Sequence, residues 1–284
     1  AIATGVADDD SSFSIISPEQ SDGNYSLTVT AADSSGNISE ISDSLSLTID
    51  TALPVIPIVT TTETATNDTT PTIEGVAEAG STVTLFVDGT ITEVTNTADS
   101  TGAFAITLPE KTNGTYDLTF TARDGAGNTS SESSVFSLTV DTIAPSEPSI
   151  TTTTSLTNDS TPAIEGVAEA GSTVTLFVDG VTTGITTTAD GTTGAYTIAP
   201  TVALSDGAYS LTVTATDEAG NTSSASRALS ITVDTTAPAA PTFTTTDTTT
   251  NDTTPIIIGT AEAGSTVELF NGDASLGTTT ADGT

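Results

Sequence analysis

Apolar and polar residues alternate along several short stretches of the chain. In one stretch every second residue is apolar and the residues between are Ser or Thr: Tyr209, Leu211, Val213 and Ala215. A period of two places such side chains on one face of a half-buried β-strand. The alternation recurs in residues 25–31 and 116–122, and no stretch has a convincing 3.6-residue apolar stripe. The pattern predicts an all-β fold.

The sequence contains an internal repeat. Residues 73–89, 164–180 and 257–270 nearly coincide, and linker aspartates stand at Asp50, Asp141 and Asp234. Their spacings of 91 and 93 residues give a period of about 92, typical of a small sandwich domain. We expect complete repeats at 50–140 and 141–233, the C-terminal half of a repeat at 1–49, and the N-terminal half of another at 234–284.

Each repeat has room for about seven short strands with a turn every 8–12 residues. This spacing predicts immunoglobulin-like β-sandwiches in tandem, arranged as an extended rod. Tyr25, Tyr116 and Tyr209 each open the sixth strand, directly after an Asp-Gly or Asn-Gly turn. That place suits a tyrosine corner, in which the hydroxyl pins the preceding loop.

The two terminal half-repeats are complementary, and two interpretations fit them. The chain is either cut in phase from a longer array, or each copy completes a split domain with an identical neighbour, head to tail, as a filament. The first interpretation is favoured because tandem arrays are usually long.

Four motifs recur at fixed phase: Asp-Thr-x-x-Pro in the linker, Asn-Asp-x-Thr-Pro, Gly-Val-Ala-Glu-Ala-Gly-Ser-Thr-Val, and Asp-x-Ala-Gly-Asn. Together they resemble the bacterial immunoglobulin-like repeats of giant secreted surface adhesins, such as biofilm-associated proteins and other type-I-secreted adhesins. The resemblance covers the whole chain. It implies an extracellular stalk on the bacterial cell surface that serves cell adhesion and biofilm formation. In that family calcium rigidifies the junctions, and regions outside this sequence contact a host or abiotic surface.

Composition narrows the possible chemistry. The chain has 37 acidic and 3 basic residues, a net charge of −34, and no His, Cys, Met or Trp. The absence of His and Cys excludes Ser-His-Asp and Cys-His catalysis and the usual zinc sites. Three cations cannot neutralise a nucleic-acid backbone, and no apolar run is long enough for membrane insertion. We expect no enzyme, although a short variable loop in residues 90–100 leaves ligand binding as a third possibility.

The remaining small partner is a hard cation, and Ca²⁺ takes six to eight oxygen ligands. In a sandwich, the B–C, D–E and F–G loops meet the linker at the N-terminal end of each repeat. Four carboxylates gathered there would repel one another without a cation, so we expect calcium at the junctions. The candidate ligands are Asp33, Asp50, Glu78, Asp124, Asn128, Asp141, Glu169, Asp217, Asn221 and Asp234, with Asp68 and Asp159 at the opposite end.

Each of these acids also has a structural interpretation. Asp217 alone would be taken for a turn former, and Glu78 and Glu169 fit a solvated turn slightly better than a ligand site. For the Asn-Asp pair at 158–159, an Asx turn before Pro162 and a ligand role are equally favoured. The calcium prediction therefore depends on the recurrence of the linker and F–G aspartates, not on any single acid.

Overall fold

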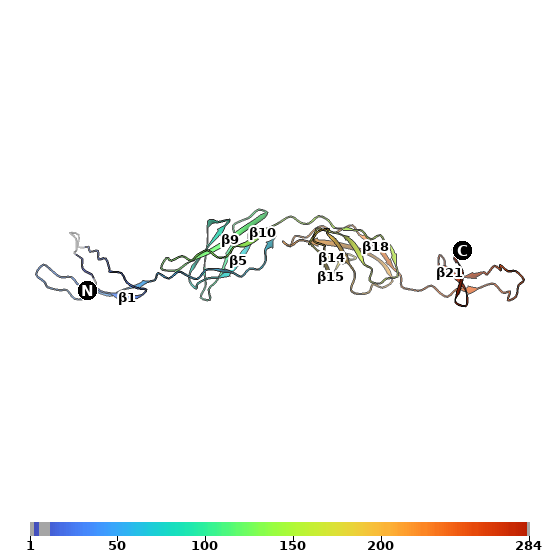
Figure 1. The fold of residues 1–284 in the computed structure, drawn as a ribbon, viewed down its shortest axis with the longest axis horizontal. Coiled ribbons are helices and arrows are strands. Elements are labelled where there is room, and N and C mark those ends of the chain that lie inside the picture. Colours follow the sequence, from blue (N-terminus) through green and yellow to red (C-terminus); the bar gives the residue numbers. More distant parts are fainter. Residues whose placement is uncertain (1–2, 6–11, 283–284) are drawn as a thin grey trace. The chain divides into compact units, whose positions relative to one another are not determined.

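The computed structural model describes residues 3–5 and 12–282, and its regular elements are all β-strands (Figure 1). Two compact units are present: Ala1–Ala144 with Glu218–Asn221, and Pro145–Asp217 with Thr222–Thr284. The first unit holds the repeat 50–140 and the half-repeat at the N-terminus, and the second holds most of the repeat 141–233 and the half-repeat at the C-terminus. Within the described ranges no helix is long and apolar enough to span a membrane.

The first complete repeat is a sandwich of two sheets. One sheet has the order β3–β5–β8, with bounds Ile58–Val59, Thr72–Val76 and Ala103–Thr107. The other has the order β4–β10–β9–β6–β7, with bounds Ala65–Thr66, Phe136–Val140, Gly114–Arg123, Thr82–Val87 and Thr90–Thr97. All pairings are antiparallel except that between β4 and β10, which is parallel.

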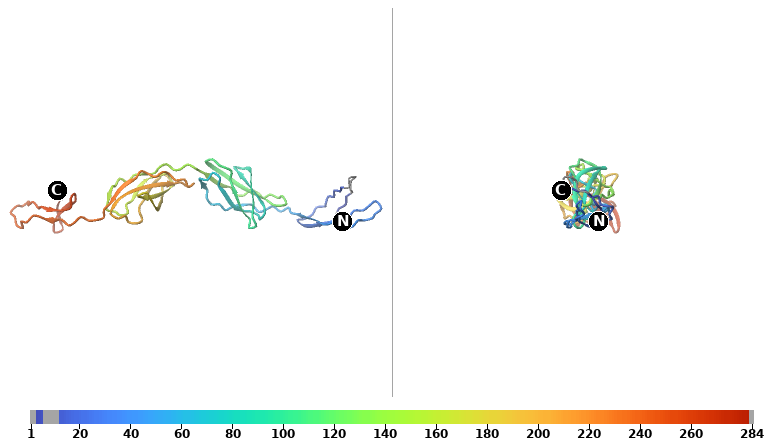
Figure 2. Two further views of the ribbon diagram at one scale, coloured as in Figure 1. Left: turned by 180° about the vertical axis from the view of Figure 1, so that it is seen from behind. Right: turned by 90° about the vertical axis from the view of Figure 1, so that its left-hand side faces the viewer.

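The second complete repeat has the same topology. Its smaller sheet is β11–β13–β16, with bounds Ser149–Ile150, Ile164–Val167 and Ala195–Ile198. Its larger sheet is β12–β18–β17–β14–β15, with bounds Leu156–Thr157, Leu229–Val233, Gly207–Thr216, Thr173–Val178 and Val181–Thr188. Figure 2 shows both repeats from behind. The predicted all-β fold of tandem two-sheet sandwiches is confirmed.

The number of strands differs slightly from the prediction. The sequence predicts about seven strands per repeat, but the structure has eight, β3 to β10, because the first strand is divided into β3 and β4, which belong to opposite sheets. Between them the amides of Thr60 and Thr61 both donate to the Glu74 carbonyl, at 2.9 and 3.3 Å. This shared acceptor breaks the regular ladder, and the chain crosses to the other sheet after it.

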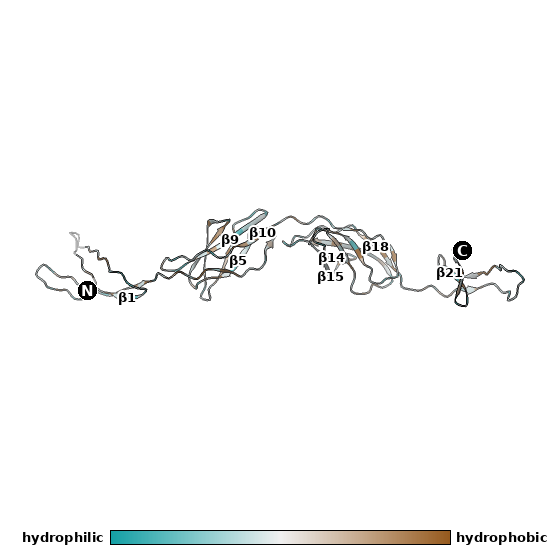
Figure 3. Cartoon of the chain, in the orientation of Figure 1, coloured by the Kyte–Doolittle hydropathy of each residue, from teal (hydrophilic) through white to brown (hydrophobic). Residues whose placement is uncertain are grey.

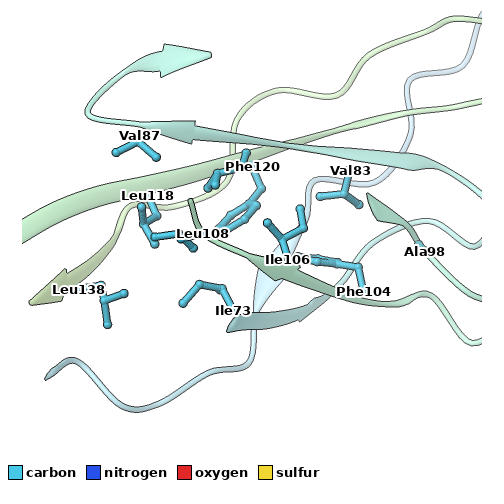
Figure 4. Close-up of a cluster of buried hydrophobic side chains, with 11 residues drawn as sticks. Ile73, Val83, Val87, Ala98, Phe104, Ile106, Leu108, Leu118, Phe120 and Leu138 are labelled. Atoms are coloured by element: carbon cyan, nitrogen blue, oxygen red, sulfur yellow. The ribbon is translucent and has the colours of Figure 1, made fainter. Parts of the chain in front are cut away.

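The core of the first repeat lies between the sheets (Figure 4). Ile73 and Ile106 from the small sheet face Leu85, Phe120 and Leu138 from the large one, and each is at most 1% exposed. The second repeat has an equivalent core built around Ile164, Leu176, Val213 and Ile231. Figure 3 shows the hydrophobic residues concentrated on the strands of both sandwiches. The period-two pattern thus marks the buried faces correctly.

The predicted tyrosine corner forms in every copy. The hydroxyls of Tyr25, Tyr116 and Tyr209 donate to the carbonyl four residues upstream, at 2.7, 2.8 and 3.0 Å. Each bond ties the loop before the sixth strand to the strand itself.

In each complete repeat, a pair of buried serines replaces strand pairing after the F–G loop. Ser130 and Ser133 accept the backbone N–H groups of Ala122 and Phe120, at 3.0 and 3.1 Å, beyond the point where the pairing of β9 with β10 ends. Each serine hydroxyl also donates to the carbonyl of the next residue. The hydroxyls therefore satisfy buried backbone donors that would otherwise have no partner.

The terminal halves form short sheets. In residues 12–49, β1 (Gly23–Leu27) pairs with β2 (Leu45–Ile49). In residues 234–282, β19 (Thr242–Phe243) pairs with β20 (Gly259–Thr260), and β21 (Thr266–Asn271) pairs with β22 (Ala274–Thr280). The strand predicted over 25–31 is regular only to Leu27, because among the described residues no strand pairs with β1 as β6 pairs with β9 in a complete repeat.

Candidate functional site at the repeat linkers

The F–G loop of the first repeat is closed by the carboxylate of Asp124. Its Oδ1 accepts the backbone N–H of Gly127 at 2.7 Å and of Asn128 at 2.9 Å, and its Oδ2 accepts the Asn128 amide at 2.8 Å. These bonds, that of the Asn128 side chain above all, hold the pKa of Asp124 below its usual value. The repeated Asp-x-x-x-Asn spacing thus encodes a closed loop.

The same asparagine contacts the linker. The Asn128 amide also donates to the backbone carbonyl of Asp50, at 2.9 Å. The Asp50 side chain bonds within the linker, where its Oδ1 accepts the N–H of Ala52 at 3.0 Å. One amide therefore joins the F–G loop of a repeat to the linker that precedes it.

The next linker residue is held from the preceding half-repeat. The backbone N–H and the hydroxyl of Thr51 both donate to Asp22 Oδ1, at 3.1 and 3.0 Å. Asp22 directly precedes Gly23, the first residue of β1, in the loop closed by the Tyr25 hydroxyl. The dipeptide Asp50-Thr51 is thus bonded on both sides, by Asn128 and by Asp22.

Both kinds of bond recur at other linkers. Asn221, which belongs to the same compact unit as Asp141, donates its amide to the Asp141 carbonyl at 2.7 Å. Thr142 donates its backbone N–H and its hydroxyl to Asn113 Oδ1, at 3.1 and 2.9 Å.

In the second unit, Thr235 donates the corresponding two bonds to Asp206 Oδ1, at 2.8 and 2.7 Å. The neighbouring hydroxyl of Thr236 donates to Asp206 Oδ2 at 2.6 Å and contributes most to lowering the pKa of Asp206. Asp234 Oδ1 accepts the N–H of Thr236 at 3.1 Å, as Asp50 and Asp141 accept theirs.

The remaining predicted ligands lie in turns. Asp68 and Asp159 each accept the N–H and the hydroxyl of the threonine two residues on, which is the Asx-turn interpretation. Glu78 and Glu169 are exposed beside tight turns, where their backbone carbonyls accept a serine hydroxyl. Asp33 repeats the Asp124 arrangement with Asn37, and the Asn37 side chain is the main cause of its lowered pKa. Asp217 begins the corresponding loop of the second repeat.

These residues, as placed, do not form a calcium coordination sphere. Within the described ranges, no three His, Cys, Asp or Glu side chains converge to hold a metal ion. Asp124 Oδ1 and Oδ2 and the Asp50 carbonyl each accept an N–H hydrogen bond. Calcium at the junctions stays a prediction of the sequence.

Sequence reasoning missed the residues that hold the linker threonine. Asp22, Asn113 and Asp206 are not among the predicted ligands, although they stand in the Asp-Gly or Asn-Gly turns before the corner tyrosines. They do carry a signal, because each stands 29 residues before the linker threonine. The signal escaped notice because Asp and Asn alternate at this position, so it does not appear as an acidic repeat.

A shallow hollow beside β11 is lined by one acidic and one basic residue, Glu147 and Arg227, together with Ile150, Thr152 and Leu229. This hollow does not test whether the protein catalyses a reaction, so the expectation that it is not an enzyme remains a prediction.

Comparison with known proteins identifies the repeats. The family model described as a bacterial Ig-like domain matches residues 59–142 and 144–235. Exoglucanase B of Cellulomonas fimi is 32% identical over 229 residues, which cover 74% of this chain and 20% of that protein. The chain thus corresponds to about a fifth of this relative.

Solved structures include two similar chains. The fibronectin(III)-like modules of CbhA from Clostridium thermocellum are 18% identical, with a TM-score of 0.44 over 63% of this chain and 94% of that one. The BSP domain of a biofilm associated protein is 25% identical, with a TM-score of 0.26 over 65% and 30%. With the family model covering both complete sandwiches and more than half of the sequence, the chain belongs to the bacterial Ig-like domain family.

Proposed function

We propose that the chain is a stalk segment of an extracellular bacterial surface protein, which spaces an adhesive region from the cell and so serves adhesion and biofilm formation. The single observation that carries this proposal is the repetition of one sandwich with a hydrogen-bonded linker at each junction. A spacer needs folded units joined in series, and the recurrent Asp, Asn and Thr contacts described above hold the loops and the linkers.

Family membership supports a modular role. Exoglucanase B is about five times longer than its matched region, so similar repeats occur there as one part of a larger protein. The net charge of −34 adds self-repulsion between repeats, which favours an extended, soluble chain. The proposal requires no catalytic group and no bound metal.

Small-angle X-ray scattering of the full chain tests this proposal. A compact globule of 284 residues has a radius of gyration of about 19 Å, and an unfolded chain about 60 Å. A folded stalk gives a value well between the two, together with the circular dichroism of a β protein. A radius near 19 Å would mean that the repeats collapse on one another and would contradict a spacer role.

A second candidate is self-assembly, in which half-repeats of two copies complete one sandwich. Leu47 of β2 is 42% exposed, whereas its counterparts Leu138 and Ile231 are each 1% exposed. Similarly, Ile257 is 44% exposed and its counterpart Ile73 is 1% exposed. The half-repeats therefore expose apolar positions that a complete repeat buries, and we infer that a second copy can cover them.

Analytical ultracentrifugation over a concentration series tests this candidate. Wild-type chain should associate as concentration rises, and Leu47→Asp should abolish association by placing a charge in the new interface. Ser46→Asp adds the same charge on the opposite face of β2, where Ser46 is exposed, and should leave association intact. A wild-type chain that stays monomeric throughout would rule out self-assembly.

A further inference from the structure

We infer that the Asp-Thr dipeptide of the linker is a metal-independent lock, closed by an asparagine from the following repeat and by an Asp or Asn from the preceding one. The inference rests on the proposed stalk function and names the residues that keep a junction ordered. It is drawn from Asp50-Thr51, where every partner lies in one compact unit.

The first half of the lock is the amide of Asn128. Its two donors are used on two different segments: one bond goes to Asp124 in its own loop and one to the Asp50 carbonyl, 78 residues earlier in the chain. Asp124 also accepts two backbone N–H groups of the loop, so the loop itself holds the Asn128 amide in position for the linker. The side-chain amide of asparagine has the two N–H donors that these two bonds require.

The second half is the grip on Thr51. Asp22 Oδ1 accepts both the backbone N–H and the hydroxyl of Thr51, and the hydroxyl also bonds Asp22 Oδ2 at 3.2 Å. Asn113 Oδ1 accepts the same two donors of Thr142, so an amide oxygen takes the place of the carboxylate at this linker. The Thr of the Asp-Thr-x-x-Pro motif therefore has a specific role, which is to present these two donors.

The lock uses oxygen atoms of the kind that calcium binds, because the Asp50 carbonyl and Asp124 Oδ2 both accept from Asn128. Comparing the linker with and without calcium therefore tests whether the hydrogen bonds alone keep it ordered. If the lock suffices, removal of metal leaves the linker ordered. If calcium is required, the linker opens when the ion is removed.

Hydrogen exchange of the linker amides in the full chain separates these cases. We expect the amides of residues 51–53 to be equally protected in EDTA and in excess CaCl₂. In EDTA, Asn128→Ala should raise their exchange rates about fivefold, the factor that corresponds to one hydrogen bond of ordinary net strength. Protection that appears only with calcium, or rates in Asn128→Ala equal to wild type, would overturn the lock.

Two matched variants guard against a general loss of structure. Asn37→Ala removes the same bond to its loop aspartate, Asp33, but within the described residues Asn37 bonds no linker carbonyl, so exchange at 51–53 should stay unchanged. Thr51→Ser keeps both donors and should exchange like wild type, whereas Thr51→Val loses the hydroxyl bond and should exchange faster. Equal rates for the Ser and Val variants would overturn the grip of Asp22.

This measurement is independent of the stalk proposal. A collapsed particle in solution scattering would contradict the stalk while leaving the protection of the linker amides in place. Conversely, an unprotected linker in an extended particle would contradict only the lock.

Discussion

At the scale of single residues, many aspartates in the described part of the chain accept hydrogen bonds from nearby N–H and O–H groups. The side-chain amide of Asn128 is the main cause of the lowered pKa of Asp124, the Thr101 hydroxyl is that of Asp99, and the backbone N–H of Thr193 is that of Asp190. The sequence identifies these aspartates by their fixed phase. It does not distinguish a carboxylate that binds a cation from one that binds amides, because both need the same oxygen atoms.

The pH dependence of Asp124 follows from these bonds. Because its folded pKa is depressed, its ionised form contributes stability that is present above the unfolded pKa and is lost as pH falls through the folded value. Asn128→Ala removes the largest cause of the shift, so the pKa of Asp124 should rise toward its ordinary value. An NMR titration of the side-chain carboxyl measures this. Asn37→Ala is the control, since it should raise the pKa of Asp33 and leave Asp124 unchanged.

At the scale of strands and loops, the alternating pattern predicts which residues face the core, and the structure buries Leu118, Phe120 and Ala122 of β9 completely. The tyrosine corner is also predictable from the sequence, because its hydrogen bond joins residues only four apart. The division of the first strand into β3 and β4 cannot be predicted from local sequence, because it depends on pairing with two different sheets. The bond from Asn128 to Asp50 spans 78 residues, and no local pattern encodes it.

Close packing within the small sheet can be tested by substituting one of its glycines. A Cβ on Gly75 of β5 would lie 2.6 Å from the Ile58 carbonyl of β3 and would clash with the Phe104 ring of β8. Gly75→Ala should therefore lower the free energy of unfolding by about 1–3 kcal/mol through overpacking. Thermal and denaturant unfolding measure this change.

Gly125 supplies the matched control for this substitution. A Cβ there meets no atom within 4 Å, so Gly125→Ala should change the free energy of unfolding by less than about 0.5 kcal/mol. Equal effects of the two substitutions would show that space beside β5 is not limiting.

At the scale of the whole molecule, two complete sandwiches have separate cores and lie in separate compact units. The family and the fold follow from the repeat period and the strand pattern, both of which can be found in the sequence. The role of the charge does not follow in the same way. The acids recur at fixed phase, as a calcium array would require, but the structure engages many of them in hydrogen bonds to turns, loops and linkers.

The central claim is that this chain is a mechanical spacer built from independent folded repeats, and stretching single full-length molecules tests it most directly. The account predicts two discrete unfolding events, one for each complete sandwich. Each should release on the order of 300 Å of contour length, the reach of roughly 91 extended residues less the folded length. The events should be the same in EDTA. Smooth extension without discrete events, or one event that releases both repeats together, would contradict the account.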